Sequence, residues 1–238
     1  SPEDLARLKT QSPESYAELS ATADAFPTAF TTSPLGNIPE GWEVKGLDQI
    51  ANYLNGLALQ KFRPKDESHF LPVLKIAQLK KGATDGAEKA SPDIKPEYIV
   101  DNGDIVFSWS GSLVVDVWCG GKAALNQHLF KVTSDEYPKW LYYLYTRHHL
   151  QEFQRIAADK AVTMGHIKRE HLSQALCAVP KLDSKLMDIC GRALQNNLSK
   201  QIELRLECTS LAETRDALLP KLLSGEIDVS ALNDMEEA

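Results

Sequence analysis

One stretch of the sequence, residues 183–223, constrains the fold more than any other. It has no proline before Pro220, a single glycine at Gly191, and a high content of Leu, Glu, Lys, Arg, Gln and Ala. These residue types favour the α-helix. A continuous helix of this length measures about 60 Å at roughly 1.5 Å per residue, which is too long to pack entirely against one small domain. The stretch therefore predicts a long helix that pairs with another helix.

The apolar residues of this stretch support that interpretation because they recur at alternating steps of three and four. Asn197, Gln201 and Arg215 interrupt the pattern with polar side chains. Such spacing is typical of the apolar seam of a coiled coil. The alternative is an amphipathic helix that covers only its own domain. The residues that we predict for helix pairing, here called the seam, are Met187, Cys190, Leu194, Leu204, Cys208, Leu211, Leu218 and Leu222.

Charge and hydropathy limit the classes of function. The 238-residue chain has a formal net charge of −7, which by itself disfavours nucleic-acid binding. Residues 40–180, however, contain seventeen basic and seventeen acidic side chains, so the excess negative charge lies toward the two ends. No apolar run reaches the ~20 residues that cross a bilayer, and no basic-then-apolar leader is visible. We therefore expect a cytoplasmic protein that does not enter a membrane.

The pattern of short apolar runs and turn residues predicts an α+β fold in which a β-rich domain with packed helices precedes the long helix. Strands are predicted at residues 70–76, 104–109, 113–118 and 124–132, and a helix begins after Pro138. Residues 78–82 are predicted to form a basic turn. The predicted organisation is a partly helical segment and extended linker at 1–37, a domain at 38–180, the long helix at 181–224 and an acidic tail at 225–238.

Several short motifs, in order and at characteristic spacing, resemble the specificity subunits of type I restriction-modification systems. Each motif is weak alone, but together they extend over roughly residues 36–228. The motifs are Ile-Pro-Glu-Gly-Trp-Glu-Val at 38–44, Gly-Asp-Ile-Val-Phe-Ser-Trp-Ser-Gly-Ser at 103–112, Asn-Gln-His-Leu-Phe at 126–130, Gly-His-Ile-Lys at 165–168, and Arg-Asp-Ala-Leu-Leu-Pro-Lys-Leu-Leu-Ser-Gly-Glu-Ile at 215–227.

The resemblance implies a target-recognition domain attached to a long conserved helix. Complete subunits of this family usually carry two such domains and two antiparallel helices, whereas this chain has one of each. The chain also has Pro180-Lys181-Leu182-Asp183 where many members have Pro-Pro-Leu-x-Glu-Gln. The single domain implies that two copies pair through the long helix. The implied partners are double-stranded DNA, modification (methyltransferase) subunits and a restriction/translocase subunit; S-adenosylmethionine, ATP and Mg²⁺ would belong to those subunits and none to this chain.

Reading a DNA sequence requires contacts to phosphates and to base edges, and the domain contains suitable side chains in its predicted loops. Arg and Lys match guanine, whereas Gln and Asn match adenine. Each lysine alone has the simpler interpretation of a solvated surface charge. The polar triplet 126–128 lies in a predicted strand, where a structural role is favoured. The predicted DNA-binding residues are Gln60, Lys61, Arg63, Lys65, Gln78, Lys80, Lys81, Ser108, Ser110, Ser112, Lys160, Thr163, His166 and Lys168.

Enzyme motifs are missing from the sequence. No H-E-x-x-H or Cys/His spacing for a metal appears, and residues 120–123 lack the first glycine and the hydroxyl residue of a phosphate-binding loop. We predict no catalytic residue, no metal site and no enzyme activity in this chain. Two alternatives remain open at this point: a scaffold protein with a coiled-coil tail that does not bind DNA, and an enzyme that uses His128 or His166.

Overall fold

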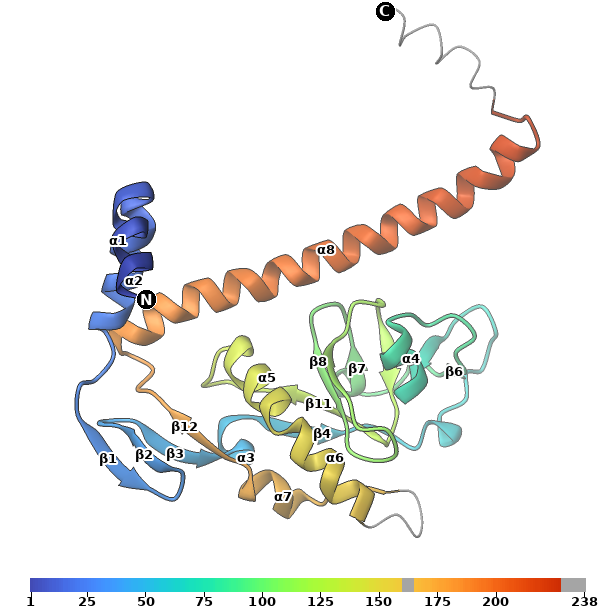
Figure 1. Cartoon of the computed structure of the whole chain (residues 1–238). Coiled ribbons are helices and arrows are strands. Elements are labelled where there is room, and N and C mark those ends of the chain that lie inside the picture. The colour runs from blue at the N-terminus through green and yellow to red at the C-terminus, as the bar shows by residue number, and fades with distance from the viewer. Residues whose placement is uncertain (160–164, 228–238) are drawn as a thin grey trace, which may run out of the picture. The chain divides into compact units, whose positions relative to one another are not determined.

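The computed structural model describes residues 1–159 and 165–227 (Figure 1). It contains both helices and short strands, followed by a long helix, which confirms the predicted fold class. Residues 1–198 form one compact unit, and a second unit begins at Ser199 inside the long helix. The predicted domain boundaries at 37/38 and 180/181 stay a prediction.

Two short helices, α1 (Pro2–Gln11) and α2 (Pro13–Asp24), begin the chain, and each has a proline at its start. Proline suits the first turn of a helix because the amide hydrogen that it lacks would have no partner there. The extended linker predicted within residues 1–37 contains β1 (Phe30–Ser33), which forms an antiparallel hairpin with β2 (Gly36–Pro39). Gly36 has φ +87°, which the tight turn requires.

The central sheet has the order β4-β11-β8-β9 and is entirely antiparallel. Its inner face carries a cluster of aromatic rings, in which Tyr53, Phe107 and Phe130 lie 5.8–6.3 Å apart between centroids. Such contacts stabilise a core beyond the area that they bury. The strands are β4 (Asn52–Asn55), β8 (Ile105–Ser108), β9 (Val115–Val117) and β11 (Leu129–Thr133).

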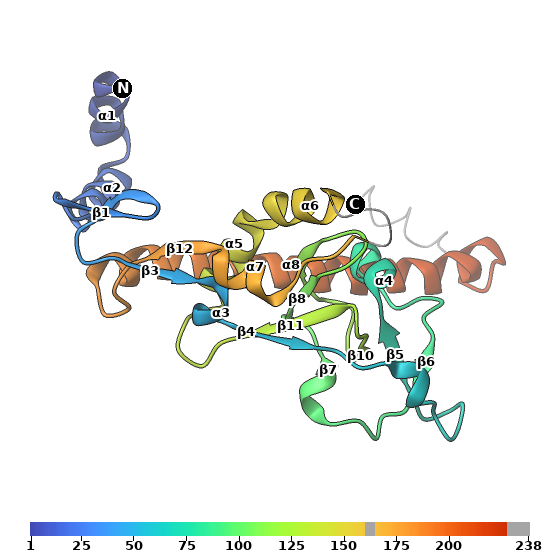
Figure 2. The same ribbon diagram turned by 90° about the horizontal axis from the view of Figure 1, so that it is seen from below.

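A second sheet has the order β6-β5-β10-β7, and its central strands β5 and β10 run parallel (Figure 2). The prediction of one continuous strand at 124–132 was wrong. The strand β10 ends at Leu125 in this second sheet, and β11 begins at Leu129 in the central sheet. The predicted basic turn at 78–82 was also wrong, because Ile76–Lys81 forms the helix α4. The strands of this sheet are β5 (Leu71–Leu74), β6 (Lys89–Ala90), β7 (Ile99–Val100) and β10 (Ala123–Leu125).

The remaining elements of the compact unit pack around these sheets. A small third sheet pairs β3 (Glu43–Gly46) with β12 (Leu176–Val179). The helix predicted after Pro138 forms as α5 (Lys139–His148), and α6 (Leu150–Asp159) follows it directly. The short helices are α3 (Leu47–Ile50), α7 (Arg169–Gln174), and the 3-10 turns η1 (Leu59–Lys61) and η2 (Pro96–Tyr98).

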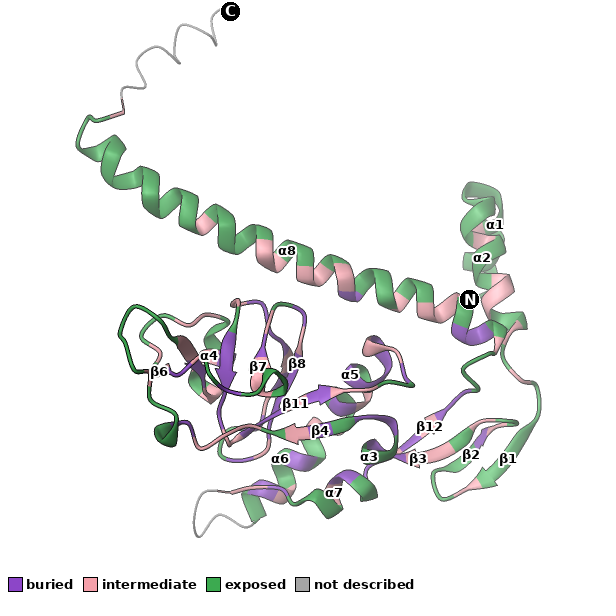
Figure 3. Cartoon of the chain, turned by 180° about the vertical axis from the view of Figure 1, so that it is seen from behind, coloured by how far each residue is buried: buried purple, intermediate pink, exposed green. Residues whose placement is uncertain are grey.

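The long helix forms as predicted: α8 runs from Lys185 to Leu223, a length of 39 residues. Its first turns belong to the compact unit, where Leu186, Met187 and Leu198 are buried. Gly191 lies beside the indole of Trp140, because a Cβ at this glycine would be 3.6 Å from the ring. Beyond Leu198 most residues of α8 are exposed (Figure 3).

Candidate nucleic-acid interface

The turn at residues 126–128, between β10 and β11, is the point where several loops meet. The amide of Asn126 donates to the carbonyl of Leu74 (3.1 Å), and the amide of Gln127 donates to the carbonyl of Leu57 (2.9 Å). Because β5 and β10 are parallel, the residues that follow both strands lie at the same end of the sheet. The segment that leads to η1 and the start of α4 are therefore both held beside this turn.

Gly56 permits this close arrangement of backbones. A Cβ at Gly56 would lie 2.3 Å from the carbonyl oxygens of Leu125 and Asn126, a distance that no side chain tolerates. Glycine allows two backbones to approach where any other residue would separate them. The close contact at Gly56 thus fixes where the segment with Gln60 and Lys61 leaves the sheet.

The turn at 108–112 joins the same cluster from β8. The amide of Gly111 donates to the carbonyl of Gly165 (2.8 Å), and the amide of Ile167 donates to the carbonyl of Trp109 (3.0 Å). Ser110 and His166 form an isolated antiparallel bridge. We call the four segments 55–63, 108–112, 126–128 and 165–168 the loop cluster.

Side chains inside the loop cluster form a polar network. Nδ1 of His128 lies 2.9 Å from Oγ of Ser110, and Nε2 of His128 lies 3.4 Å from Nε2 of Gln127. The indole Nε1 of Trp109 donates to the carbonyl of Gln127 (3.1 Å). We predicted a structural role for the 126–128 triplet in a strand, and did not select Trp109, Gln127 or His128 for DNA binding. Asn126 followed by polar residues between two apolar runs is a turn signal that pointed to them.

The three predicted serines occupy different positions. Ser108 is fully buried, and its hydroxyl donates to the carbonyl of Ser112 (2.7 Å) and accepts from the amide of Val114 (2.8 Å). Its side chain therefore holds the turn, and we leave it out of the proposed interface. Ser110 is also buried and contacts His128, whereas the side chain of Ser112 is exposed.

Most predicted basic residues are exposed and have weak ion pairs. Arg63 lies 4.0 Å from Glu88, Lys65 lies 3.8 Å from Asp93, Lys81 lies 3.0 Å from Asp85, and Lys168 lies 3.3 Å from Glu170. Exposed pairs of this kind contribute about 0–1 kcal/mol, so a phosphate can replace the carboxylate at little cost. Lys61 and Lys80 are exposed as well.

Glu88 reduces the positive charge near Arg63. The ammonium of Lys75 lies 2.5 Å from Oε1 of Glu88 and, by this hydrogen bond and its charge, lowers the pKa of that carboxyl group. Glu88 is therefore ionised at neutral pH. A phosphate that approaches Arg63 has to compete with this carboxylate.

The two predicted glutamines differ in exposure. Gln60 is exposed in η1, within the loop cluster, whereas Oε1 of Gln78 in α4 is enclosed without a hydrogen-bond partner. His166 is partly exposed and its ring lies edge-on to Trp109, with 6.3 Å between centroids. Lys160 and Thr163 lie outside the described residues.

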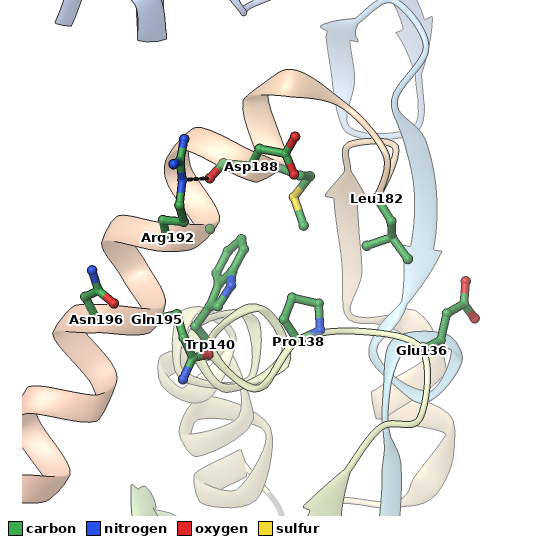
Figure 4. A pocket seen from close by; sticks show the side chains of 10 residues that line it. Glu136, Pro138, Trp140, Leu182, Asp188, Arg192, Gln195 and Asn196 are labelled. Atoms are coloured by element: carbon green, nitrogen blue, oxygen red, sulfur yellow. Dashed lines mark hydrogen bonds between the residues drawn. The ribbon is translucent and has the colours of Figure 1, made fainter. Parts of the chain in front are cut away.

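The seam on α8 divides into two parts. Met187, Cys190 and Leu194 line an apolar hollow of about 390 Å³ with Trp140 and Leu144, so the first part packs on its own domain. An adjoining hollow of about 770 Å³ lies between α5 and the start of α8, with Trp140, Asp188 and Arg192 in its wall (Figure 4). In the second part, the exposed residues are Leu204 (47%), Leu211 (62%), Leu218 (42%), Leu222 (40%) and Cys208.

Within residues 1–159 and 165–227, no three His, Cys, Asp or Glu side chains gather where they could hold a metal ion. Across the same residues, no helix combines the length and the apolar character needed to cross a membrane.

Comparison with known proteins places these features in a family. The family model described as "Type I restriction modification DNA specificity domain" matches residues 39–204. The HindI specificity subunit of Haemophilus influenzae is 22% identical over 238 residues, a match that covers 95% of this chain and 51% of that protein. The EcoBI specificity subunit of Escherichia coli is 24% identical over 189 residues, covering 79% of this chain and 37% of that protein. The chain thus spans about half or less of the length of these curated relatives.

Among solved structures, the crystal structure of the HsdS subunit from Thermoanaerobacter tengcongensis covers 94% of this chain and 54% of that chain, with a TM-score of 0.47 at 14% identity. The predicted resemblance agrees with the family model, as does the prediction that the chain is not itself an enzyme. Because the family model matches well over half of the chain, this chain belongs to the family of type I restriction modification DNA specificity domains.

Proposed function

We propose that this chain recognises one half of a bipartite DNA target through the loop cluster and directs adenine methylation and restriction by partner subunits. The observation that carries the proposal is the convergence of segments 55–63, 108–112, 126–128 and 165–168 within the domain that matches the family. Base reading requires several polar side chains held rigidly at one place, and phosphate binding requires exposed cations beside them. Gln60, Lys61 and Arg63 supply such groups in this cluster.

Chemistry on DNA would then belong to the partner subunits, which would bind S-adenosylmethionine, ATP and Mg²⁺. The proposed partners are a modification subunit and a restriction/translocase subunit. The similarity to specificity subunits of type I restriction enzymes supports this proposal. The chain itself would select the site and hold the assembly on it.

We further propose that two copies pair through the second part of the seam, so that two loop clusters face the two halves of the target. Leu204, Leu211 and Leu218 are exposed at steps of seven residues, with Leu222 four residues further on, and this heptad spacing supports the pairing. An antiparallel pair is favoured by charge, because a parallel pair places Arg215 directly against its own copy, and like charges opposite each other are destabilising. In an antiparallel pair formed by residues 204–222, Leu204 of one copy would lie opposite Leu222 of the other.

The proposal is tested by sequencing methylated sites in cells that contain the partner subunits, with and without this chain. We expect a bipartite adenine-methylated motif that disappears when the chain is removed. Binding of the purified chain to duplex DNA should also weaken as salt rises, because phosphate contacts release counterions. Absence of any chain-dependent motif, together with no salt-dependent DNA binding, would favour the scaffold alternative.

A further inference from the structure

We propose that Gln127 reads an adenine in the DNA major groove, and that Ser110 and His128 are positioning residues that fix the orientation of its amide. This inference rests on the proposed function and deepens it. It starts from the polar network of the loop cluster, which connects a buried hydroxyl to a partly exposed amide through one imidazole ring.

The network defines which groups donate. The amide nitrogen Nε2 of Gln127 can only donate, so Nε2 of His128, 3.4 Å away, has to accept. A neutral imidazole with an acceptor at Nε2 carries its hydrogen on Nδ1, which then donates to Oγ of Ser110 at 2.9 Å. Ser110 is only 2% exposed, so this end of the network is held inside the protein.

The backbone of Gln127 is held on both sides as well. Its amide donates to the carbonyl of Leu57 (2.9 Å), and its carbonyl accepts from the indole of Trp109 (3.1 Å). A side chain whose backbone and amide are both oriented loses little conformational freedom when it binds a ligand. Gln127 is partly exposed, unlike the buried Ser110 that supports it.

The groups of Gln127 that lie outside this network match adenine. The network uses one N–H of the amide and leaves the carbonyl oxygen and the second N–H. In the major groove, adenine presents an N6 donor and an N7 acceptor, and a glutamine amide pairs with both at once. Guanine presents two acceptors at the same edge, which the carbonyl oxygen would oppose.

The neighbouring groups fit an approach of duplex DNA at this place. Lys61 and Arg63 follow the Leu57 segment that contacts Gln127, and Lys168 follows His166, whose ring contacts Trp109. Exposed cations that follow the segments in contact with Gln127 and Trp109 can bind phosphates while the amide reads a base.

The test uses the whole chain and a pool of DNA duplexes with randomised positions, from which bound sequences are selected and counted. We expect Gln127→Glu to change the preferred base at one position from adenine to cytosine, because a carboxylate accepts from the cytosine N4 amino group. Gln127→Met and His128→Phe should reduce discrimination at that same position about tenfold or more, and leave the other positions unchanged. Gln174→Glu, an exposed substitution in α7, is the matched control.

Three outcomes are informative. A change of preference confined to one position, in variants whose thermal unfolding matches that of the parent chain, supports the inference. Unchanged preference at every position in Gln127→Glu and Gln127→Met, with salt-dependent DNA binding retained, would overturn it while the proposed function stands. If the parent chain does not bind DNA at any salt concentration, both the proposed function and this inference are wrong.

Discussion

Nζ of Lys131 lies 2.8 Å from Oδ2 of Asp104, and both side chains are mostly buried. The same carboxylate accepts from the amide of Asp101 (2.8 Å), and the same ammonium donates to the carbonyl of Ile99 (2.9 Å). Ile99 belongs to β7 in the second sheet, whereas Lys131 belongs to β11 in the central sheet. This ion pair therefore connects the two sheets whose ends carry the loop cluster.

Lys131→Met should destabilise the domain because it leaves the Asp104 carboxylate without its partner in a mostly buried place. We expect a loss of about 1–3 kcal/mol in the free energy of unfolding, between the values typical of exposed and fully buried pairs. Urea unfolding measures this loss. Arg155→Met is the control, because its pair with Glu152 is exposed and its removal should leave the free energy of unfolding nearly unchanged. Equal stability of the two variants would contradict the prediction.

The stability of the domain should fall as the pH decreases through the ordinary range of histidine. Burial and the neighbouring His148 lower the pKa of His149, whose Nε2 donates to the carbonyl of Leu176 (3.0 Å). The unfolded chain takes up this proton near pH 6.5, and the folded chain only at lower pH. Below about pH 6.5 the unfolded state therefore binds more protons, which favours unfolding.

Thermal unfolding at several pH values between 5 and 8, on the order of half a unit apart, checks this dependence. His149→Gln should reduce the loss of stability toward low pH, because glutamine does not titrate. His69→Gln, an exposed substitution, controls for the removal of one histidine. If the unfolding temperature depends on pH equally in His149→Gln and in the parent chain, another group is responsible for the loss of stability.

The elements that sequence reasoning predicted well are those whose formation depends on local residue types. Helix α8 follows from its helix-favouring composition and its seam, and β5 follows from a short apolar run between polar segments. Asn126 is a local turn signal, but the break between β10 and β11 also depends on contacts with distant residues. It arises because Asn126 bonds to Leu74 while Leu129 pairs with Ser108, two contacts between residues far apart in the sequence.

The residues of the candidate site could likewise be predicted only in part from local residue types. Residue types identified the exposed cations and Gln60, but they gave no indication that Ser108 is enclosed by its own turn. Gln127 and His128 were missed because their position within an apolar stretch suggested a strand. The flanking strands β10 and β11 belong to different sheets. The triplet between them therefore forms a loop, which lies beside Ser110.

Substitution of a seam leucine by glutamate should prevent pairing of two copies. Leu211→Glu and Leu218→Glu would each place two carboxylates in an apolar interface, where burial of an unpaired charge is strongly unfavourable. Sedimentation equilibrium should give a dimer for the parent chain and a monomer for both variants. Ser210→Glu, on the outer side of the same helix turn, is the matched control and should remain dimeric. A parent chain that is monomeric at all concentrations would refute the pairing.

Cys208 reports the direction of pairing, since it is exposed and belongs to the seam. In a parallel pair the two Cys208 thiols would face each other and form a disulfide on mild oxidation. In the proposed antiparallel pair, Cys208 would face Leu218 instead, so Leu218→Cys should form covalent dimers through Cys208 and the parent chain should not. The double variant Leu218→Cys/Cys208→Ser should lose the cross-link. Efficient cross-linking of the parent chain through Cys208 would establish the parallel arrangement.

The length of α8 should determine the spacing between the two halves of the DNA target. Removal of residues 205–211 deletes seven residues and keeps the phase of the seam, so each helix becomes shorter by about 10 Å. This length corresponds to roughly three base pairs at about 3.4 Å per pair. Sequencing of methylated sites should therefore show the same two half-sites separated by about three fewer base pairs. Insertion of a second copy of residues 205–211 should lengthen the separation by a similar amount. If the separation stayed the same in both variants, α8 would not set the distance between the two recognition domains.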